Sequence, residues 1–255
     1  MLYGPFKPTN IERIIMKVRS EITKSHDRVW EEMTRPGARL SGEERVLVVQ
    51  ELRAASACRI CSESKNSLSF AYRVGEHEYV DSRMPDVWVE LVHKLVNDPG
   101  RIHRSWVQNL FKDGLEEVEY VEIAGLVSAV CVVDTFHEAL SLPLRSLPKG
   151  VSGAASYKVP ATAADEGAYV SMIPVDGLQD DYEDLYDTRH WVPNVHRAFS
   201  LVPAAARLAN ELMGSHYFPY ESVPRYDDQN HEYAISKVQM ELVASRVSKN
   251  NDCFY

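Results

Sequence analysis

The feature that most constrains the fold is a helix-forming segment that occurs twice and runs each time toward a cysteine. Ser41 begins the first copy and Ser236 the second, and Cys58 and Cys253 close them, with a constant offset of 236 − 41 = 195 and 253 − 58 = 195. Each serine lies three residues before a Glu or Gln, the capping-box pattern that starts a helix. We therefore predict an all-α fold that contains a duplicated helix–cysteine unit.

Capping residues and apolar residues at helical spacing predict further helices along the rest of the chain. We expect them at residues 10–28, 86–97, 102–112 and 116–142, with a turn region at 30–37. The last of these helices is the longest helical pattern in the protein. The sequence Asp-Pro-Gly directly after residue 97 should end the helix before it.

Composition shifts along the chain predict its domain organisation. We expect an N-terminal helical domain at 1–150, an acidic linker at 151–189 and the start of a second, truncated helical domain at 190–255. The linker includes the acidic run DGLQDDYEDLYD, which favours a solvated segment, with a short ordered piece at 168–175.

Charge and hydropathy argue against two classes of partner. The 28 Lys and Arg and 37 Asp and Glu give 28 − 37 = −9, which disfavours nucleic acid and anionic membranes. No apolar run reaches the length needed to cross a bilayer, and the first residues lack the pattern of a signal peptide. We therefore expect a cytoplasmic protein. Its four cysteines are too few and too unevenly spaced for a disulfide scaffold.

The C-terminal residues carry a resemblance to a known family. Glu241 is separated from Cys253 by eleven residues, and Tyr255 follows two positions later. This pattern resembles the Glu-x11-Cys-x-Tyr-Cys-x3-His signature of AhpD-like alkylhydroperoxidases in the carboxymuconolactone decarboxylase superfamily. The run Pro-Asn-Val-x-Arg-Ala-x-Ser-Leu-x-Pro at 193–203 also resembles the helix pair before the motif in peroxidase-related members.

The second cysteine and the histidine of that signature would follow residue 255. We therefore expect the chain to be cut inside its motif, with cysteine or selenocysteine as the next residue. A selenocysteine codon read as a stop, a cloning boundary or a frameshift would each give this end.

The resemblance implies thiol-dependent reduction of a hydroperoxide, with an external dithiol as reductant and no metal, haem or flavin cofactor. In that reading Glu241 is the base of a proton relay and Cys253 is the resolving cysteine. The family resemblance also implies a homo-oligomer, a trimer or a hexamer. Two alternatives stay open. One is a non-catalytic helical scaffold. The other is lactone decarboxylation, which the Cys-x-x-Cys pattern of Cys58 and Cys61 disfavours because that chemistry needs no dithiol.

The first copy holds a complete Cys-x-x-Cys pair, Cys58 and Cys61, in altered surroundings. Val46 stands at the position of Glu241, and Lys65 stands where the family pattern has its histidine. We interpret the pair as a redox-active dithiol, with a pair of small buried side chains as the alternative. A zinc site needs about four ligands, and neither a second Cys-x-x-Cys nor a close Cys-x-x-His supplies them.

The longest helical pattern carries four further polar candidates. Glu122 and His137 lie on roughly the same side, with Asp134 close by and Cys131 roughly opposite. Within one straight helix Glu122 and His137 are roughly 22 Å apart, so they cannot share a proton directly. We therefore favour a packing role for His137, as for His196 and His216.

Overall fold

The computed structural model describes residues 18–67, 72–178, 182–186, 192–218, 233–251 and 253, and these form nine α-helices. The first half holds α1 (Ser20–Thr34), α2 (Gly42–Ala55), α3 (Arg59–Lys65), α4 (Asp86–Asn97), η1 (Pro99–Arg101), α5 (Arg104–Lys112) and α6 (Glu117–Ala139). The second half holds η2 (Val175–Gly177), α7 (Asn194–Arg197), α8 (Pro203–His216) and α9 (Lys237–Asn250). Within these residues the one β-bridge joins Ala164 and Met172, so the predicted all-α fold is confirmed.

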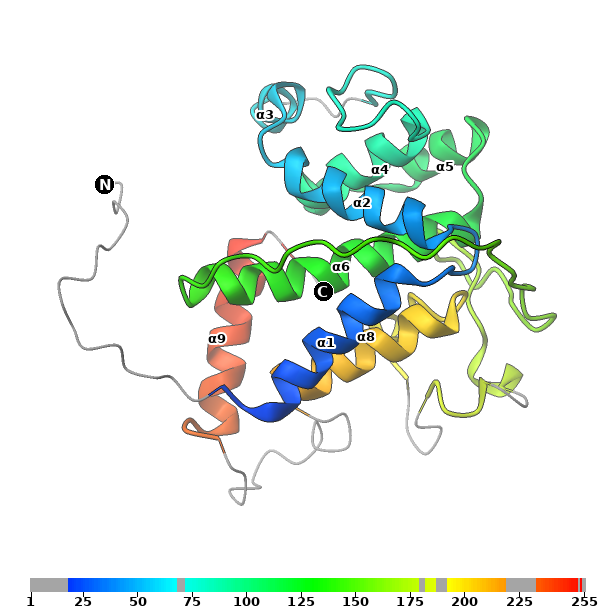
Figure 1. The fold of residues 1–255 in the computed structure, drawn as a ribbon. Helices are drawn as coiled ribbons and strands as arrows, with labels where there is room; N and C mark the ends of the chain where they lie inside the picture. Colours follow the sequence, from blue (N-terminus) through cyan, green and yellow to red (C-terminus); the bar gives the residue numbers. More distant parts are fainter. Residues whose placement is uncertain are drawn as a thin grey trace.

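Helix α6 lies at the centre of the molecule and is apolar on nearly all sides. It packs against α2 and α4 on one side and against α1 and α8 on the other (Figure 1). A helix that is hydrophobic all round must be covered on all sides. The main core joins Trp106 of α5, Ile123 and Val130 of α6, and Leu208 of α8.

Several predicted helix boundaries are confirmed. Helix α4 covers residues 86–97 as expected, and α2 begins with a complete capping box between Ser41 and Glu44. The expected turn at 30–37 is wrong over its first five residues, because α1 continues to Thr34. Val29, Trp30 and Met33 are buried against the core, and that burial extends the helix. The first part of the helix expected at 10–28 lies outside the described residues.

The duplicated unit recurs as local structure but in two different environments. Helices α2 and α9 keep the same offset at both ends, 237 − 42 = 195 and 250 − 55 = 195, and both have capping boxes. Most apolar residues of α2 are buried, whereas Val238 and Leu242 of α9 are 66% and 72% exposed. A further helix opening at Cys253, for which Asp252 would be the cap, would lie largely outside the described residues.

The segment predicted as a linker contains ordered structure where the short piece was expected. Ile173 is fully buried in a small cluster with Leu185, Tyr186, Val192 and Ala206. Just before this segment, Gly150 lies so close to α2 that a Cβ there would meet backbone atoms of Gly42 at 2.3 Å. The domain boundaries at 150 and 190 stay predictions. Helix α8, from the second half, packs against α1 and α6 and belongs to the same main core as the first half.

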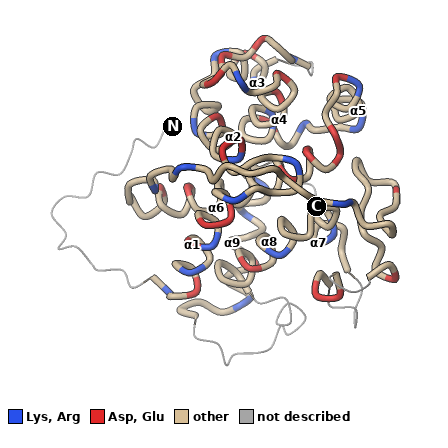
Figure 2. The backbone as a smooth tube through the Cα atoms, turned by 45° about the vertical axis from the view of Figure 1, so that its right-hand side comes forward, with Lys and Arg blue, Asp and Glu red and all other residues tan. Residues whose placement is uncertain are grey.

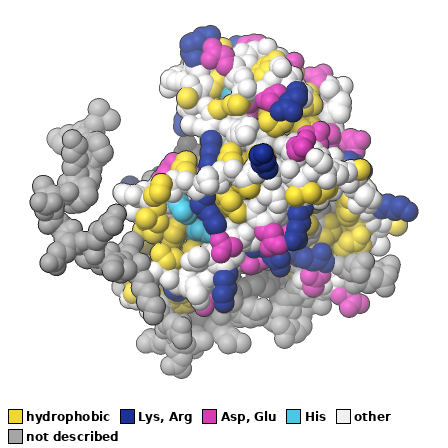
Figure 3. Space-filling view, viewed as in Figure 1, with side chains coloured by type: hydrophobic (Ala, Val, Ile, Leu, Met, Phe, Trp, Pro, Cys, Tyr) yellow, Lys and Arg dark blue, Asp and Glu magenta, His cyan; other side chains and the backbone are white. Residues whose placement is uncertain are grey.

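Charged side chains of both signs are mixed along the described backbone. Figure 2 shows Lys and Arg next to Asp and Glu on most helices, and the face drawn in Figure 3 shows the same mixture with hydrophobic groups between. Among the described helices, none combines the length and the apolar content that crossing a bilayer requires.

A contact between a buried and a half-buried histidine joins the two halves of the chain. His26 of α1 and His216 of α8 approach to 2.9 Å between their Nε2 atoms, with the rings of Phe136 and His137 beside them. Burial lowers the pKa of His26 to about 4, and the positive charges of His216, His137 and Arg145 add to this effect while Asp27 opposes it. The neutral form of His26 is therefore the form that the fold favours.

This contact predicts a loss of stability in mild acid. The folded pKa lies below the ordinary value of 6.5, so the stabilising contribution is complete above pH 6.5 and is lost as the pH falls toward 4. We expect the free energy of unfolding to fall by about 1–2 kcal/mol more in the wild type than in His26→Gln between pH 7.5 and pH 5. Urea unfolding at pH 7.5 and pH 5 measures the difference, and equal losses in both proteins would contradict it.

Candidate metal centre

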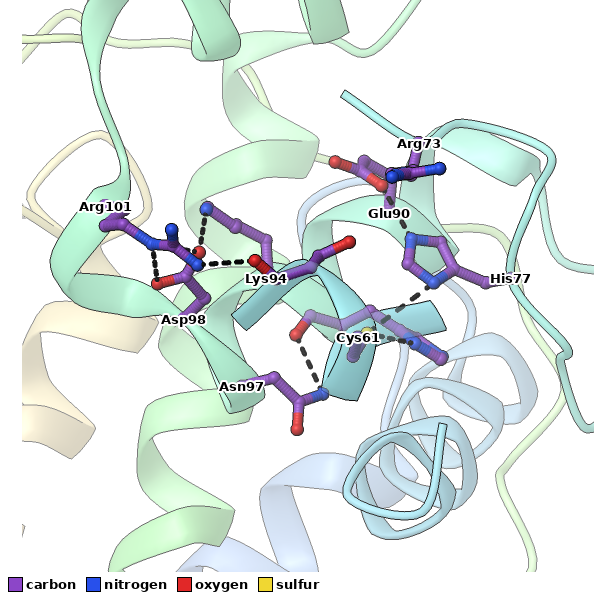
Figure 4. Close-up of a pocket in the computed structure, with 10 residues that line it drawn as sticks. Cys61, Arg73, His77, Glu90, Lys94, Asn97, Asp98 and Arg101 are labelled. Atoms are coloured by element: carbon purple, nitrogen blue, oxygen red, sulfur yellow. Dashed lines mark hydrogen bonds and ion pairs between the residues drawn. The ribbon is translucent and has the colours of Figure 1, made fainter. Parts of the chain in front are cut away.

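Four side chains that ligate metals in many proteins converge beside α3. They are Cys58, Cys61, His77 and His93, and their donor atoms all lie within 4.8 Å of one another. Both sulfurs and both rings are buried, with His77 8% and His93 1% exposed. Figure 4 shows the Cys61 end of this cluster, with His77 pointing at the sulfur.

Three structural elements bring the four residues together. Cys58 is the N-cap of α3, and Cys61 lies in its first turn. His93 lies in the middle of α4 on the face that packs against α2, and His77 comes from the loop between α3 and α4. The packing of α4 on α2 therefore places His93 opposite Cys58 and Cys61, which follow α2 in the chain.

The distances in the cluster match those expected around a tetrahedral zinc ion. His77 Nδ1 lies 3.6 Å from the sulfurs of both Cys58 and Cys61, and His93 Nδ1 lies 3.3 Å from Cys61 Sγ. With Zn–S of about 2.3 Å and Zn–N of about 2.0–2.1 Å, tetrahedral geometry puts sulfur and nitrogen about 3.5 Å apart. Three sulfur–nitrogen distances thus already match a coordination shell, and all four donor atoms lie within 4.8 Å of one another.

Each histidine is held by a buried carboxylate on its other nitrogen. His77 Nε2 lies 2.7 Å from Glu90 and His93 Nε2 lies 2.7 Å from Glu51. A carboxylate accepts hydrogen bonds, so each Nε2 carries a proton and the Nδ1 atoms face the sulfurs. Carboxylate–histidine pairs of this kind orient imidazole ligands around metals.

The second oxygens of both carboxylates also have partners. The indole N–H of Trp106 donates to Glu90 Oε1 at 2.7 Å, and the backbone N–H of Val80 donates to Glu51 Oε2 at 2.8 Å. Glu51 is completely buried. Buried polar networks stabilise a single arrangement when every member is satisfied, and that condition holds for these carboxylate oxygens.

Without a bound ion, this cluster would separate charge between one cysteine and one histidine. Burial alone lowers the pKa of His77, but its hydrogen bonds with the two thiols and with Glu90 outweigh burial and raise the pKa to about 10. Burial alone raises the pKa of Cys58, but its hydrogen bonds with His77 and Cys61 outweigh it and lower the pKa. For Cys61 burial prevails and raises the pKa, and for His93 burial prevails and lowers the pKa. The arrangement therefore favours a thiolate at Cys58 beside an imidazolium at His77.

The sequence argument against a four-ligand site fails, because the missing ligands are distant in sequence. His77 and His93 follow Cys61 by 16 and 32 residues, a spacing that matches no short motif. Lys65, at the position of the family's histidine, is exposed on α3. The predicted pair itself, Cys58 and Cys61, is at the centre of the cluster.

The other predicted site residues lie elsewhere. Glu241 is on α9 and Cys253 is exposed after it, and α9 lies well apart from α3 in Figures 1 and 2. The structure therefore does not bring the C-terminal candidates to the cysteine pair.

The candidates of α6 have structural partners. Glu122 is buried, and its carboxylate accepts a hydrogen bond from Arg45 at 2.8 Å and others from backbone N–H groups of Arg39 and Leu40. Asp134 forms a two-bond pair with Arg53, and burial raises the pKa of Cys131 to about 11. His137 donates from Nδ1 to the Pro143 carbonyl.

His196 is partly buried near α8.

Comparison of the chain with protein-family models, with curated proteins and with solved structures finds no match in any of the three. The resemblance to AhpD-like proteins therefore stays a prediction that rests on the residues quoted for it.

Proposed function

We propose that Cys58, Cys61, His77 and His93 bind a zinc ion that cross-links the first half of the chain. The convergence of two sulfurs and two Nδ1 atoms within 4.8 Å supports this proposal most directly. Sulfur and imidazole ligands in a tetrahedral set suit zinc, whereas calcium and magnesium prefer oxygen ligands.

The proposed role is structural. Four protein ligands close the coordination shell, whereas catalytic zinc sites keep one position open for water or substrate. Helix α3 has seven residues, too few to be stable by itself, and the described part of the loop that holds His77, residues 72–85, contains no regular helix. A metal bound to both would tie them to α4 through His93.

Metal content is the direct test. We expect the purified chain, reconstituted with zinc, to hold about one zinc ion, and its cobalt form to show the absorption of a tetrahedral thiolate site. Single changes Cys61→Ser and His93→Gln should each lower the zinc affinity strongly. The matched control is Cys131→Ser, a cysteine on α6 outside the cluster. Zinc binding that survives Cys61→Ser would contradict the proposed ligand set.

The carboxylates behind the histidines should tune the affinity. We expect Glu51→Gln and Glu90→Gln to weaken zinc binding by about 10–100-fold, because each removes the charge that orients and polarises one imidazole. Competition with a zinc chelator measures the affinity. Glu63→Gln is the control, since Glu63 lies exposed on α3 and pairs with Arg59. Equal zinc affinities in all three variants would contradict a role of Glu51 and Glu90 in zinc binding.

A second candidate function uses the same two thiols without metal. The pairing of Cys58 with His77 favours a thiolate, the reactive form in the reduction of hydroperoxides. One sulfur would attack the O–O bond, the other would close a disulfide, and an external dithiol would restore both. A reduced pair of this kind suits the cytoplasm, and a trimer or hexamer is what the family resemblance implies for the assembly.

Peroxide consumption by the metal-free chain tests this second candidate. With dithiothreitol as reductant, we expect the rate to depend on Cys58 and Cys61 and to disappear in the double Cys→Ser variant. Cys253→Ser should leave the rate unchanged, because that cysteine is exposed and follows α9, a helix that lies apart from α3 in Figure 1. A rate that persists in the double variant would rule out the dithiol mechanism.

A further inference from the structure

A large cavity lies between α2, α6 and α8, and none of its lining residues belongs to the metal cluster. Its volume is about 410 Å³, within the range of about 300–1,000 Å³ that is typical of pockets for small organic molecules. Helices α2 and α6 contribute Arg45 and Glu122, the first turn of α8 contributes Ala204, and the segment after α6 contributes Tyr157. The cavity is therefore built from both halves of the chain.

The polar wall of this cavity is an ion pair that uses only one side of a guanidinium. Arg45 Nη1 lies 2.8 Å from Glu122 Oε1, and the two side chains are only 12% and 2% exposed. Arg45 Nε is shielded from solvent and has no hydrogen-bond partner within the described residues. Buried N–H groups nearly always find an acceptor, and a guanidinium has five of them. The unpaired side of Arg45 therefore favours a ligand that supplies an acceptor.

Backbone groups hold the ion pair in one position. Glu122 Oε2 accepts hydrogen bonds from the backbone N–H groups of Arg39 at 2.7 Å and Leu40 at 3.3 Å. Gly37 lies directly against the pair, and a Cβ there would overlap with Glu122 Oε1 and Arg45 Nη1. Arg45 cannot turn away from the carboxylate without leaving a buried charge unpaired. The guanidinium is thus preorganised, with Nη1 engaged and its other side available to a ligand.

The charges around the cavity favour a ligand with a single negative charge. The planar edge formed by Nε and Nη2 of a guanidinium matches the two oxygens of a carboxylate, which it binds through two parallel hydrogen bonds. Glu122 already offsets part of the Arg45 charge, so a doubly charged phosphate would be repelled by that carboxylate. The N-terminal end of α8 adds a partial positive charge, and its first turn contains no acidic residue.

The rest of the lining suits an apolar, aromatic body. Leu126, Val202 and Leu208 provide aliphatic surface, and Tyr157 and Tyr182 provide two aromatic rings. The Tyr157 hydroxyl donates to a backbone carbonyl at 2.9 Å, and burial raises its pKa, so it carries no charge that would repel an anion. Tyrosine rings pack favourably against other aromatic rings.

We propose that this cavity binds an aromatic monocarboxylate, with the carboxylate on Arg45 and the ring among the tyrosine and aliphatic side chains. The site does not depend on the proposed metal centre, and it adds a ligand-binding function to the chain. Because α2, α6 and α8 all line the cavity, a bound carboxylate also stabilises their packing.

Binding of naphthoate to the full chain tests the proposal, with naphthamide substituted at the same ring position as the uncharged ligand of the same shape. Equilibrium dialysis measures both affinities. We expect a dissociation constant below about 1 mM for naphthoate and at least about tenfold weaker binding of naphthamide, because the amide cannot accept two charge-assisted hydrogen bonds. Equal affinities, or a dissociation constant for naphthoate above about 1 mM, would overturn the proposal.

Three variants locate the ligand. Arg45→Lys keeps a positive charge beside Glu122 but loses the planar edge, so it should weaken naphthoate binding at least about tenfold and leave naphthamide binding unchanged. Ala204→Phe fills the cavity from an exposed position and should weaken the binding of both ligands. The matched control is Ala139→Phe, at an exposed alanine at the end of α6 outside the cavity. Equal naphthoate affinity in the wild type and in Ala204→Phe would overturn the assignment to this cavity.

Discussion

The hydrogen bond between His93 and Glu51 is the interaction on which the site depends. Both groups are almost completely buried, one on α4 and one on α2. Removing one partner of such a pair leaves a buried polar group without its hydrogen bond, at a cost of about 1–3 kcal/mol. The pair therefore fixes how the two helices pack, and by doing so it sets the direction of His93 Nδ1. The sulfur of Cys61 lies where that nitrogen points.

The proposed metal centre and the proposed dithiol would be two states of one set of atoms. Without metal, His77 supplies the positive charge that stabilises the Cys58 thiolate. With metal, the ion supplies two positive charges to the same space, and His77 must give up its Nδ1 proton to bind. Peroxide reduction as a catalytic cycle needs the first state, and structural zinc needs the second. The buried carboxylates support both, because each holds its imidazole by the nitrogen that faces away from the sulfurs.

Local sequence signals predicted much of the fold and two of the four residues of the candidate metal cluster. The capping boxes at Ser41 and Ser236 and the breaker after Asn97 act within a few residues, so they could be found without knowing the rest of the structure. The extension of α1 through Trp30 could not, because it depends on burial against distant helices. His77 and His93 were missed for the same reason: only the packing of α4 on α2 brings them to the cysteine pair.

Comparison of the two copies of the helix–cysteine unit shows which residues outside the repeat complete the cluster around Cys58. Helices α2 and α9 have equal lengths and equivalent caps, so the repeated sequence specifies the helix in both places. Helix α4 covers α2, whereas no helix among the described residues packs extensively on α9, and the cysteine after it is exposed. The repeated unit alone therefore supplies a cysteine at the end of a helix. The second cysteine, two buried imidazoles and their carboxylates are what turn Cys58 into part of a site, and most of these come from α4 and the loop before it.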